Sequence, residues 1–92
     1  MEDEFKLRKN VEMATRAKTF LEDEAVKAAF DTIERQYIEA WRLTHFKDVE
    51  GREALWRGLQ ALGKFKDNLV LAITNGKLSK AQLDATRENK AA

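Results

Sequence analysis

The chain has 92 residues, enough for one domain, and its 17 basic and 16 acidic side chains give a formal net charge of +1. With 36% charged and 43% hydrophobic residues, and no run of eighteen apolar residues, the composition excludes a disordered chain and a membrane span. The absence of proline and the presence of only four glycines favour helices over strands. Because cysteine is absent, disulfides and thiolate sites are excluded. The charged start of the chain is unlike a signal peptide, so we expect a cytoplasmic location.

The first predicted helix covers about residues 5–21. Its apolar positions recur at steps of four, three, three and four: Leu7, Val11, Ala14, Ala17 and Leu21. A second helix is predicted over about 24–44, with Asp23 as its N-cap. An alternative start uses Thr19 as the cap and Glu22 as its capping-box partner.

The second helix has the spacing of a coiled-coil seam. Apolar or small residues alternate at steps of four and three along it: Val26, Phe30, Ile33, Tyr37, Ala40 and Thr44. Trp41 widens this seam. Residues 45–51 lose the period, and Asp48 can cap the next helix. So short a connection predicts that the two flanking helices are antiparallel neighbours.

The third predicted helix covers about 49–75 and has two adjacent apolar stripes. One stripe consists of Leu55, Leu59, Leu62, Leu69 and Ile73, and the other of Ala54, Gly58, Ala61, Phe65 and Ala72. Together the stripes occupy roughly half of the helix circumference at about 100° per residue. One antiparallel partner cannot cover such a face, so this helix is expected to contact at least two others, in this chain or in another subunit.

Asn75 and Gly76 predict the end of the third helix, because glycine readily adopts the left-handed conformation that follows a last turn. A capping-box pattern runs from Ser79 to Gln82, and Leu78 and Leu83 occupy the staple positions, so a short fourth helix is predicted over about 80–88. The predicted fold is therefore all-α. It is an antiparallel, coiled-coil-like helical hairpin with an additional N-terminal helix and a short C-terminal helix, a three- to four-helix bundle or oligomer in a single domain, residues 1–92.

The inventory of reactive side chains is small. Ser79 is interpreted as a helix cap, and His45 as a solvated or packing residue of a loop without a second ligand nearby. Acidic pairs such as Glu50 and Glu53 lie near a helix start, where carboxylates are favoured electrostatically. We therefore predict that the chain is not an enzyme and that it has no cofactor and no metal site.

A strip of small residues, Ala54, Gly58 and Ala61, would allow a backbone or an aromatic ring to approach closely, and Trp41 or Trp56 could fill it. This strip has two interpretations, a subunit contact or packing within the chain, and the residues alone do not separate them. The predicted protein interface comprises Trp41, Ala54, Trp56, Gly58, Ala61 and Phe65, and the predicted partner is a second copy of the chain.

A nucleic-acid contact is a second hypothesis, for which the best candidate groups are Lys6, Lys9 and Arg16 in the first helix, or Arg57 and Lys64 in the third. Nearby acidic residues, Glu12 among them, dilute the first of these basic groups, so a solvated helix face is the simpler interpretation. No recognisable helix-turn-helix unit accompanies it.

Segments 20–24, 29–42 and 50–56 resemble short helical proteins encoded in phage and prophage gene blocks, most clearly in Tyr-Ile-Glu-Ala-Trp at 37–41 and Glu-Gly-Arg-Glu at 50–53. The resemblance implies a protein of the host cytoplasm or of the virion that serves capsid assembly, DNA packaging or the head-to-tail junction. Phage structural proteins or a host protein would then be further partners.

The expected function is therefore that of a non-enzymatic assembly or adaptor protein that self-associates through helical surfaces. One alternative is a DNA-associated packaging or regulatory factor similar to the small subunit of phage terminases. The other is an inhibitor that binds a host factor.

Overall fold

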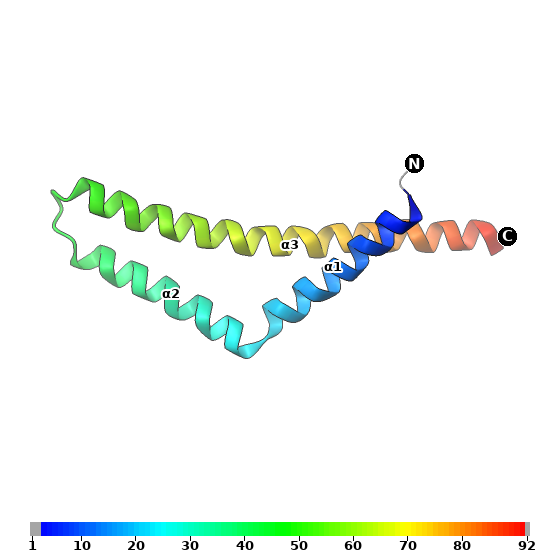
Figure 1. Cartoon of the computed structure of the whole chain (residues 1–92), viewed down its shortest axis with the longest axis horizontal. Helices are drawn as coiled ribbons and strands as arrows, with labels where there is room; N and C mark the ends of the chain where they lie inside the picture. The colour runs from blue at the N-terminus through cyan, green and yellow to red at the C-terminus, as the bar shows by residue number, and fades with distance from the viewer. Residues whose placement is uncertain (1–2, 92) are drawn as a thin grey trace. The chain divides into compact units, whose positions relative to one another are not determined.

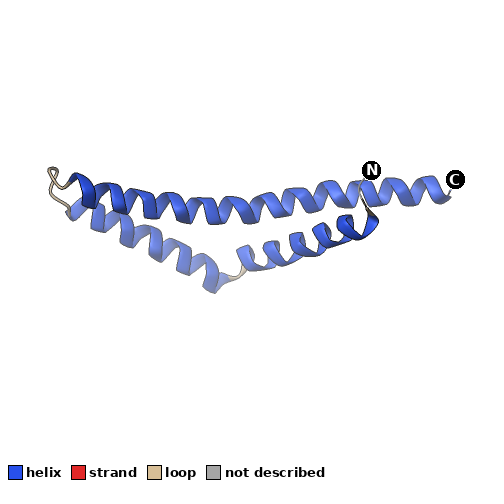
Figure 2. Cartoon of the chain, turned by 45° about the horizontal axis from the view of Figure 1, so that its top comes forward, coloured by secondary structure: helices blue, strands red, loops and turns tan. Residues whose placement is uncertain are grey.

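The computed structural model describes residues 3–91, with side chains through residue 89. The chain forms three helices, α1 (Glu4–Glu22), α2 (Glu24–Leu43) and α3 (Val49–Ala91), and residues 3–91 contain no strand (Figures 1 and 2). The all-α prediction is confirmed. None of the helices in this described range combines the length and the apolar character needed to cross a bilayer.

Two of the predicted helix starts are confirmed in detail. The Asp23 carboxylate accepts hydrogen bonds from the amides of Ala25 and Val26, at 2.9 and 3.1 Å, and caps α2. The alternative cap at Thr19 is wrong, since α1 continues past it to Glu22. At the start of α3, the Asp48 side chain accepts from the Gly51 amide at 3.0 Å, as expected of a cap.

The contacts of the chain fall into two compact units. The hairpin unit contains α2 and the part of α3 up to Asp67. The terminal unit contains α1 and the part of α3 from Asn68 onward. The expectation that the third helix touches two others is therefore confirmed, but the two partners contact successive parts of its length.

In the hairpin unit, residues 44–48 connect α2 to the antiparallel start of α3 (Figure 1). The predicted seam of α2 is its least exposed face, with Val26, Phe30, Tyr37 and Ala40 half-buried. Leu55, Leu59 and Leu62 of α3 are half-buried as well. The helices come close at Gly58, where a Cβ atom would lie 2.5 Å from Cε1 of Tyr37.

In the terminal unit, α1 packs against α3 through small residues. Leu7 and Ala17 of α1 are the buried hydrophobic residues of the described chain, at 5% exposure each. Gly76 of α3 lies against Ala14, and a Cβ atom at Gly76 would collide with the Ala14 methyl group. The side-chain amide of Asn10 donates to the buried Ser79 hydroxyl at 3.0 Å.

The predicted helix end at Asn75 and Gly76, and the separate helix over 80–88, are wrong, because α3 continues through both. No glycine of the described chain has a positive φ, so Gly76 does not terminate the helix. It allows α1 to approach closely instead. Ser79 is likewise no cap: it lies inside α3 and accepts a hydrogen bond from Asn10.

Candidate interaction surface at the tryptophan cleft

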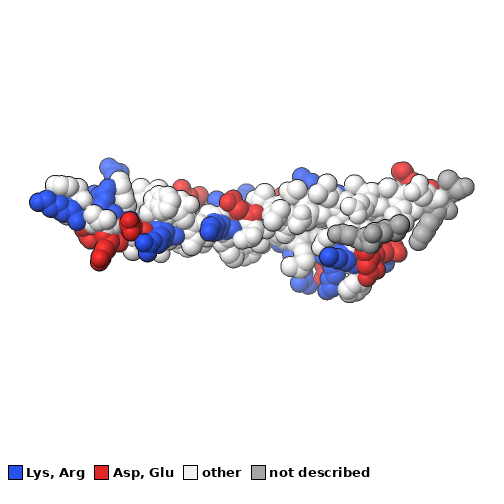
Figure 3. Space-filling model, turned by 90° about the horizontal axis from the view of Figure 1, so that it is seen from above, with Lys and Arg blue, Asp and Glu red and all other residues white. Residues whose placement is uncertain are grey.

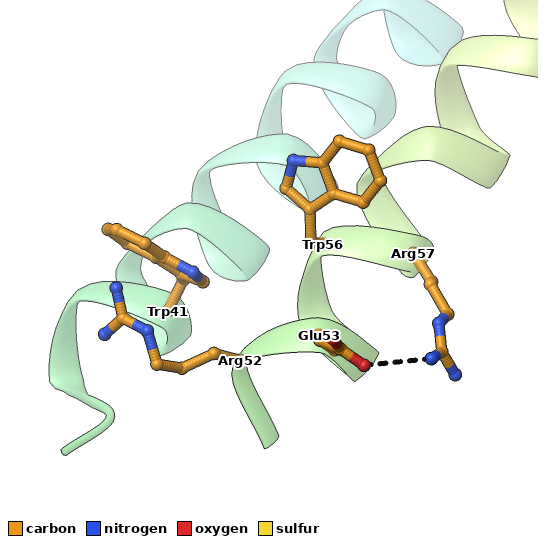
Figure 4. A pocket seen from close by; sticks show the side chains of 5 residues that line it. All are labelled: Trp41, Arg52, Glu53, Trp56 and Arg57. Atoms are coloured by element: carbon orange, nitrogen blue, oxygen red, sulfur yellow. Dashed lines mark hydrogen bonds and ion pairs between the residues drawn. The ribbon is translucent and has the colours of Figure 1, made fainter. Parts of the chain in front are cut away.

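A shallow cleft of about 500 Å³ opens on the hairpin unit near the connection between its helices. It is lined by one residue of α2 and four of α3: Trp41, Arg52, Glu53, Trp56 and Arg57 (Figure 4). The spacing of Arg52 and Trp56 places both on one side of α3, since residues four apart share a helix face. Two tryptophans from different helices therefore lie at the same opening.

Arg52 joins the two helices at this end of the hairpin. Its guanidinium carbon lies 3.9 Å from the centroid of the Trp41 ring, a cation–π contact that Figure 4 shows with the guanidinium across the indole. The same guanidinium donates to the Thr44 hydroxyl at 3.0 Å. The Thr44 hydroxyl in turn donates to the Trp41 carbonyl oxygen at 2.6 Å, at the C-terminal end of α2. These contacts hold Trp41 in place, and the residue is 38% exposed where it lines the cleft.

Trp56 has a different environment. Its side chain is 57% exposed and points outward from α3 (Figure 4). Glu53 and Arg57 form an ion pair of 3.0 Å at the edge of the cleft, with both side chains well exposed. Such an exposed pair adds little to the stability of the helix. Its two charges remain accessible to a partner.

Further apolar side chains surround the hairpin connection. Leu43, Phe46 and Val49 are 78%, 73% and 61% exposed. His45 stacks on Phe46 with ring centroids 4.6 Å apart, and its Nδ1 accepts from the Lys47 amide at 3.1 Å. The packing role expected for His45 therefore has a specific partner. These exposed apolar residues and the residues of the cleft together form what we call the tryptophan surface: Trp41, Leu43, Phe46, Val49, Arg52, Glu53, Trp56 and Arg57.

The six residues predicted as an interface do not form one patch. Trp41 and Trp56 line the cleft, whereas Gly58 packs against Tyr37 inside the hairpin. Phe65 contacts Phe30 at a centroid distance of 5.9 Å and is still 52% exposed. The remaining two, Ala54 and Ala61, are exposed. Packing within the chain is thus shown for Gly58, whereas a subunit contact at Ala54 and Ala61 stays a prediction.

Arg52 and Glu53 were not predicted as interface residues, and Arg57 was named only as a candidate nucleic-acid contact. A signal for Arg52 was present, because it continues the stripe of Leu55, Leu59 and Leu62 one turn toward the start of α3 and so faces α2. Of the candidate nucleic-acid contacts, Lys6, Lys9 and Arg16 are all exposed on α1, and Arg16 lies 3.4 Å from Glu12. Its charge is thereby partly neutralised.

No part of the described chain gathers the ligands of a metal site: residues 3–89 hold no group of three or more His, Asp or Glu side chains that could bind an ion. No family model, no curated protein and no solved structure matches the chain. Function is therefore inferred from the surfaces described above.

Proposed function

We propose that this chain is a non-enzymatic assembly protein that associates with a second copy of itself through the tryptophan surface. The observation that carries the proposal is Trp56, a large aromatic side chain that stands 57% exposed beside an open cleft. Tryptophan and arginine are the residues most enriched among those that dominate binding energy at interfaces. A contact that covers roughly 100 Å² of indole contributes about 2.5 kcal/mol.

Charge favours a second copy as the partner. In a two-fold symmetric contact, every pairing occurs twice. If a first residue of one copy contacts a second residue of the other copy, then the second residue of the one copy also contacts the first residue of the other. Glu53 and Arg57 are exposed, opposite in charge and one helical turn apart. Around a two-fold axis near the cleft, Glu53 of each copy would face Arg57 of the other. The surface is thus complementary to itself.

The small core supports the same proposal. The hairpin unit has no buried hydrophobic residue among those described, and its helices leave five large side chains more than half exposed: Leu43, Phe46, Val49, Trp56 and Phe65. Units of this size rarely bury enough apolar surface to be stable alone, and association is one of the usual remedies. The resemblance to helical proteins of phage gene blocks makes capsid assembly, packaging or the head-to-tail junction the proposed context.

Light scattering coupled to size-exclusion chromatography tests the proposal on the intact chain at tens of micromolar. We expect a mass that is a multiple of 10.6 kDa for the native sequence. Trp56→Glu should weaken association by at least about 50-fold, since it removes the indole and places a charge in the contact. Leu78→Glu is the matched control, because Leu78 is 60% exposed on the same helix outside the tryptophan surface.

A charge-swap experiment tests the two-fold arrangement. Glu53→Arg alone and Arg57→Glu alone should each associate less tightly, because like charges then face each other across the axis. A mixture of the two variants should form a mixed dimer, because each Arg would again meet a Glu. A native chain that remains a monomer at tens of micromolar contradicts self-association. Association that survives Trp56→Glu but is lost in Leu78→Glu contradicts the tryptophan surface as its site.

A further inference from the structure

A second recess lies in the terminal unit, between α1 and α3, and carries charges of one sign. Its volume is about 240 Å³, and the residues that line it come from both helices: Val11, Ala14, Thr15, Lys18, Ile73, Gly76, Lys77 and Lys80. Two of these residues, Ala14 and Gly76, lie where the helices approach closely. Three lysines and no acidic residue stand around it. We call it the lysine groove.

The three lysines differ from Arg8 and Arg16 of α1 in forming no ion pair with the described residues. Arg8 and Arg16 lie 2.9 and 3.4 Å from glutamates one turn before them in the same helix. By contrast, Lys18, Lys77 and Lys80 form no ion pair with any residue of the described chain, and all three are exposed. Glu22 and Asp84 lie one turn from Lys18 and Lys80 and do not pair with them. Three like charges around one recess attract an anion with several charges.

We propose that the lysine groove binds the phosphate backbone of duplex nucleic acid, without regard to base sequence. Lysine neutralises phosphates as a point charge, whereas base edges are read mainly by arginine, asparagine and glutamine, which the groove lacks. Unpaired strands are bound by stacking bases on aromatic rings, and no lining residue is aromatic. The Thr15 hydroxyl donates its proton to the Val11 carbonyl at 3.1 Å, so this proton is already engaged and does not reach a phosphate oxygen. The lysines therefore carry the interaction.

This site is separate from the proposed self-association, since all its residues belong to the terminal unit and none to the tryptophan surface. It also differs from the contact predicted by sequence, because Lys6, Lys9 and Arg16 do not line the groove. The groove could not be predicted from the sequence, because Lys18 is far from Lys77 and Lys80 along the chain. Lys77 and Lys80 are one turn apart, but Lys18 joins them only when α1 packs antiparallel to the end of α3.

The test is a fluorescence anisotropy titration of the full chain against a short labelled duplex of mixed sequence at several salt concentrations. Neutralising three phosphates predicts a slope of about −2.7 for the logarithm of affinity against that of salt, or a loss of about 40-fold between roughly 50 and 200 mM. The variant Lys18→Gln, Lys77→Gln, Lys80→Gln should remove most binding and make the slope shallower by about 2.7.

The control variant is Lys6→Gln, Lys9→Gln, Lys27→Gln, which lowers the net charge by the same three units, from +1 to −2, at exposed positions outside the groove. It should retain the native slope. Absence of duplex binding at low salt overturns the proposal, as does a control variant that loses as much affinity as the groove variant. Tighter binding to a single strand, or equal binding to phosphatidylserine vesicles, overturns the assignment to duplex.

Discussion

Gly63 and Gly76 both lie inside α3, and their surroundings give opposite expectations for the same substitution. Apart from the adjacent residues and backbone of α3 itself, no atom lies within 4 Å of a Cβ atom placed on Gly63. A Cβ atom on Gly76 would overlap the methyl group of Ala14 and lie 3.1 Å from the Asn10 carbonyl oxygen. Glycine costs helix stability at both positions, but only Gly76 offsets that cost by letting a second helix approach.

We therefore expect Gly63→Ala to raise the free energy of unfolding by up to about 1 kcal/mol, the intrinsic preference of alanine for helix. Gly76→Ala should lower it by about 1 to 3 kcal/mol, since the added methyl group must push α1 away. Urea unfolding followed by circular dichroism measures both. Equal stabilisation by the two substitutions would contradict the close packing of α1 on α3.

At the scale of elements, the start of α2 depends on Asp23, which satisfies two amides that have no partner within the helix. Asp23→Ala should lower the free energy of unfolding by about 1 kcal/mol. Asp31→Ala, in the middle of the same helix, is the control and should have no such cost, because Asp31 is exposed and its side chain caps nothing. Circular dichroism during urea unfolding compares the two, and an equal loss in both would contradict the capping role.

The bounds of α1 and α2 could be predicted to within a residue, because heptad spacing and the Asp23 cap are local features. The continuity of α3 past Gly76 could not be predicted. Asn75, Gly76 and Ser79 have the local pattern of a helix end and a new start, and only the position of α1 reveals that Gly76 and Ser79 serve packing. The tryptophans of the candidate site were predictable from their size and rarity. The contact of Arg52 with Trp41 was not, since it depends on how the two helices meet after the connection.

At the scale of the whole molecule, α3 belongs to both units. The prediction of a single domain is therefore tested by asking whether the two units unfold together. Both tryptophans lie in the hairpin unit, so their fluorescence reports on that unit, whereas circular dichroism reports on all helices. Leu7 lies in the terminal unit and is 5% exposed. Replacing a buried leucine by alanine typically lowers the free energy of unfolding by about 2 to 5 kcal/mol.

If the chain unfolds as one domain, Leu7→Ala should lower the unfolding midpoint seen by tryptophan fluorescence as much as that seen by circular dichroism. Leu78→Ala, at a 60% exposed position of the terminal unit, should leave both midpoints nearly unchanged. A fluorescence midpoint that stays at its native value in Leu7→Ala would show that the units unfold separately, and would refute the single-domain prediction.

The connection at residues 44–48 has a consequence for how the chain tolerates insertions. Different contacts hold its two ends: the Arg52 guanidinium of α3 donates to the Thr44 hydroxyl at the end of α2, and the Asp48 carboxylate accepts from the Gly51 amide at the start of α3. Between them, Phe46 and Lys47 are exposed. Extra residues added there would cost the entropy of a longer loop, about 0.6 kcal/mol for each doubling, together with the hydrogen bond from the Lys47 amide to His45 Nδ1. This is the place where an epitope, a fluorescent label or a protease site could be grafted while both helix ends keep their contacts.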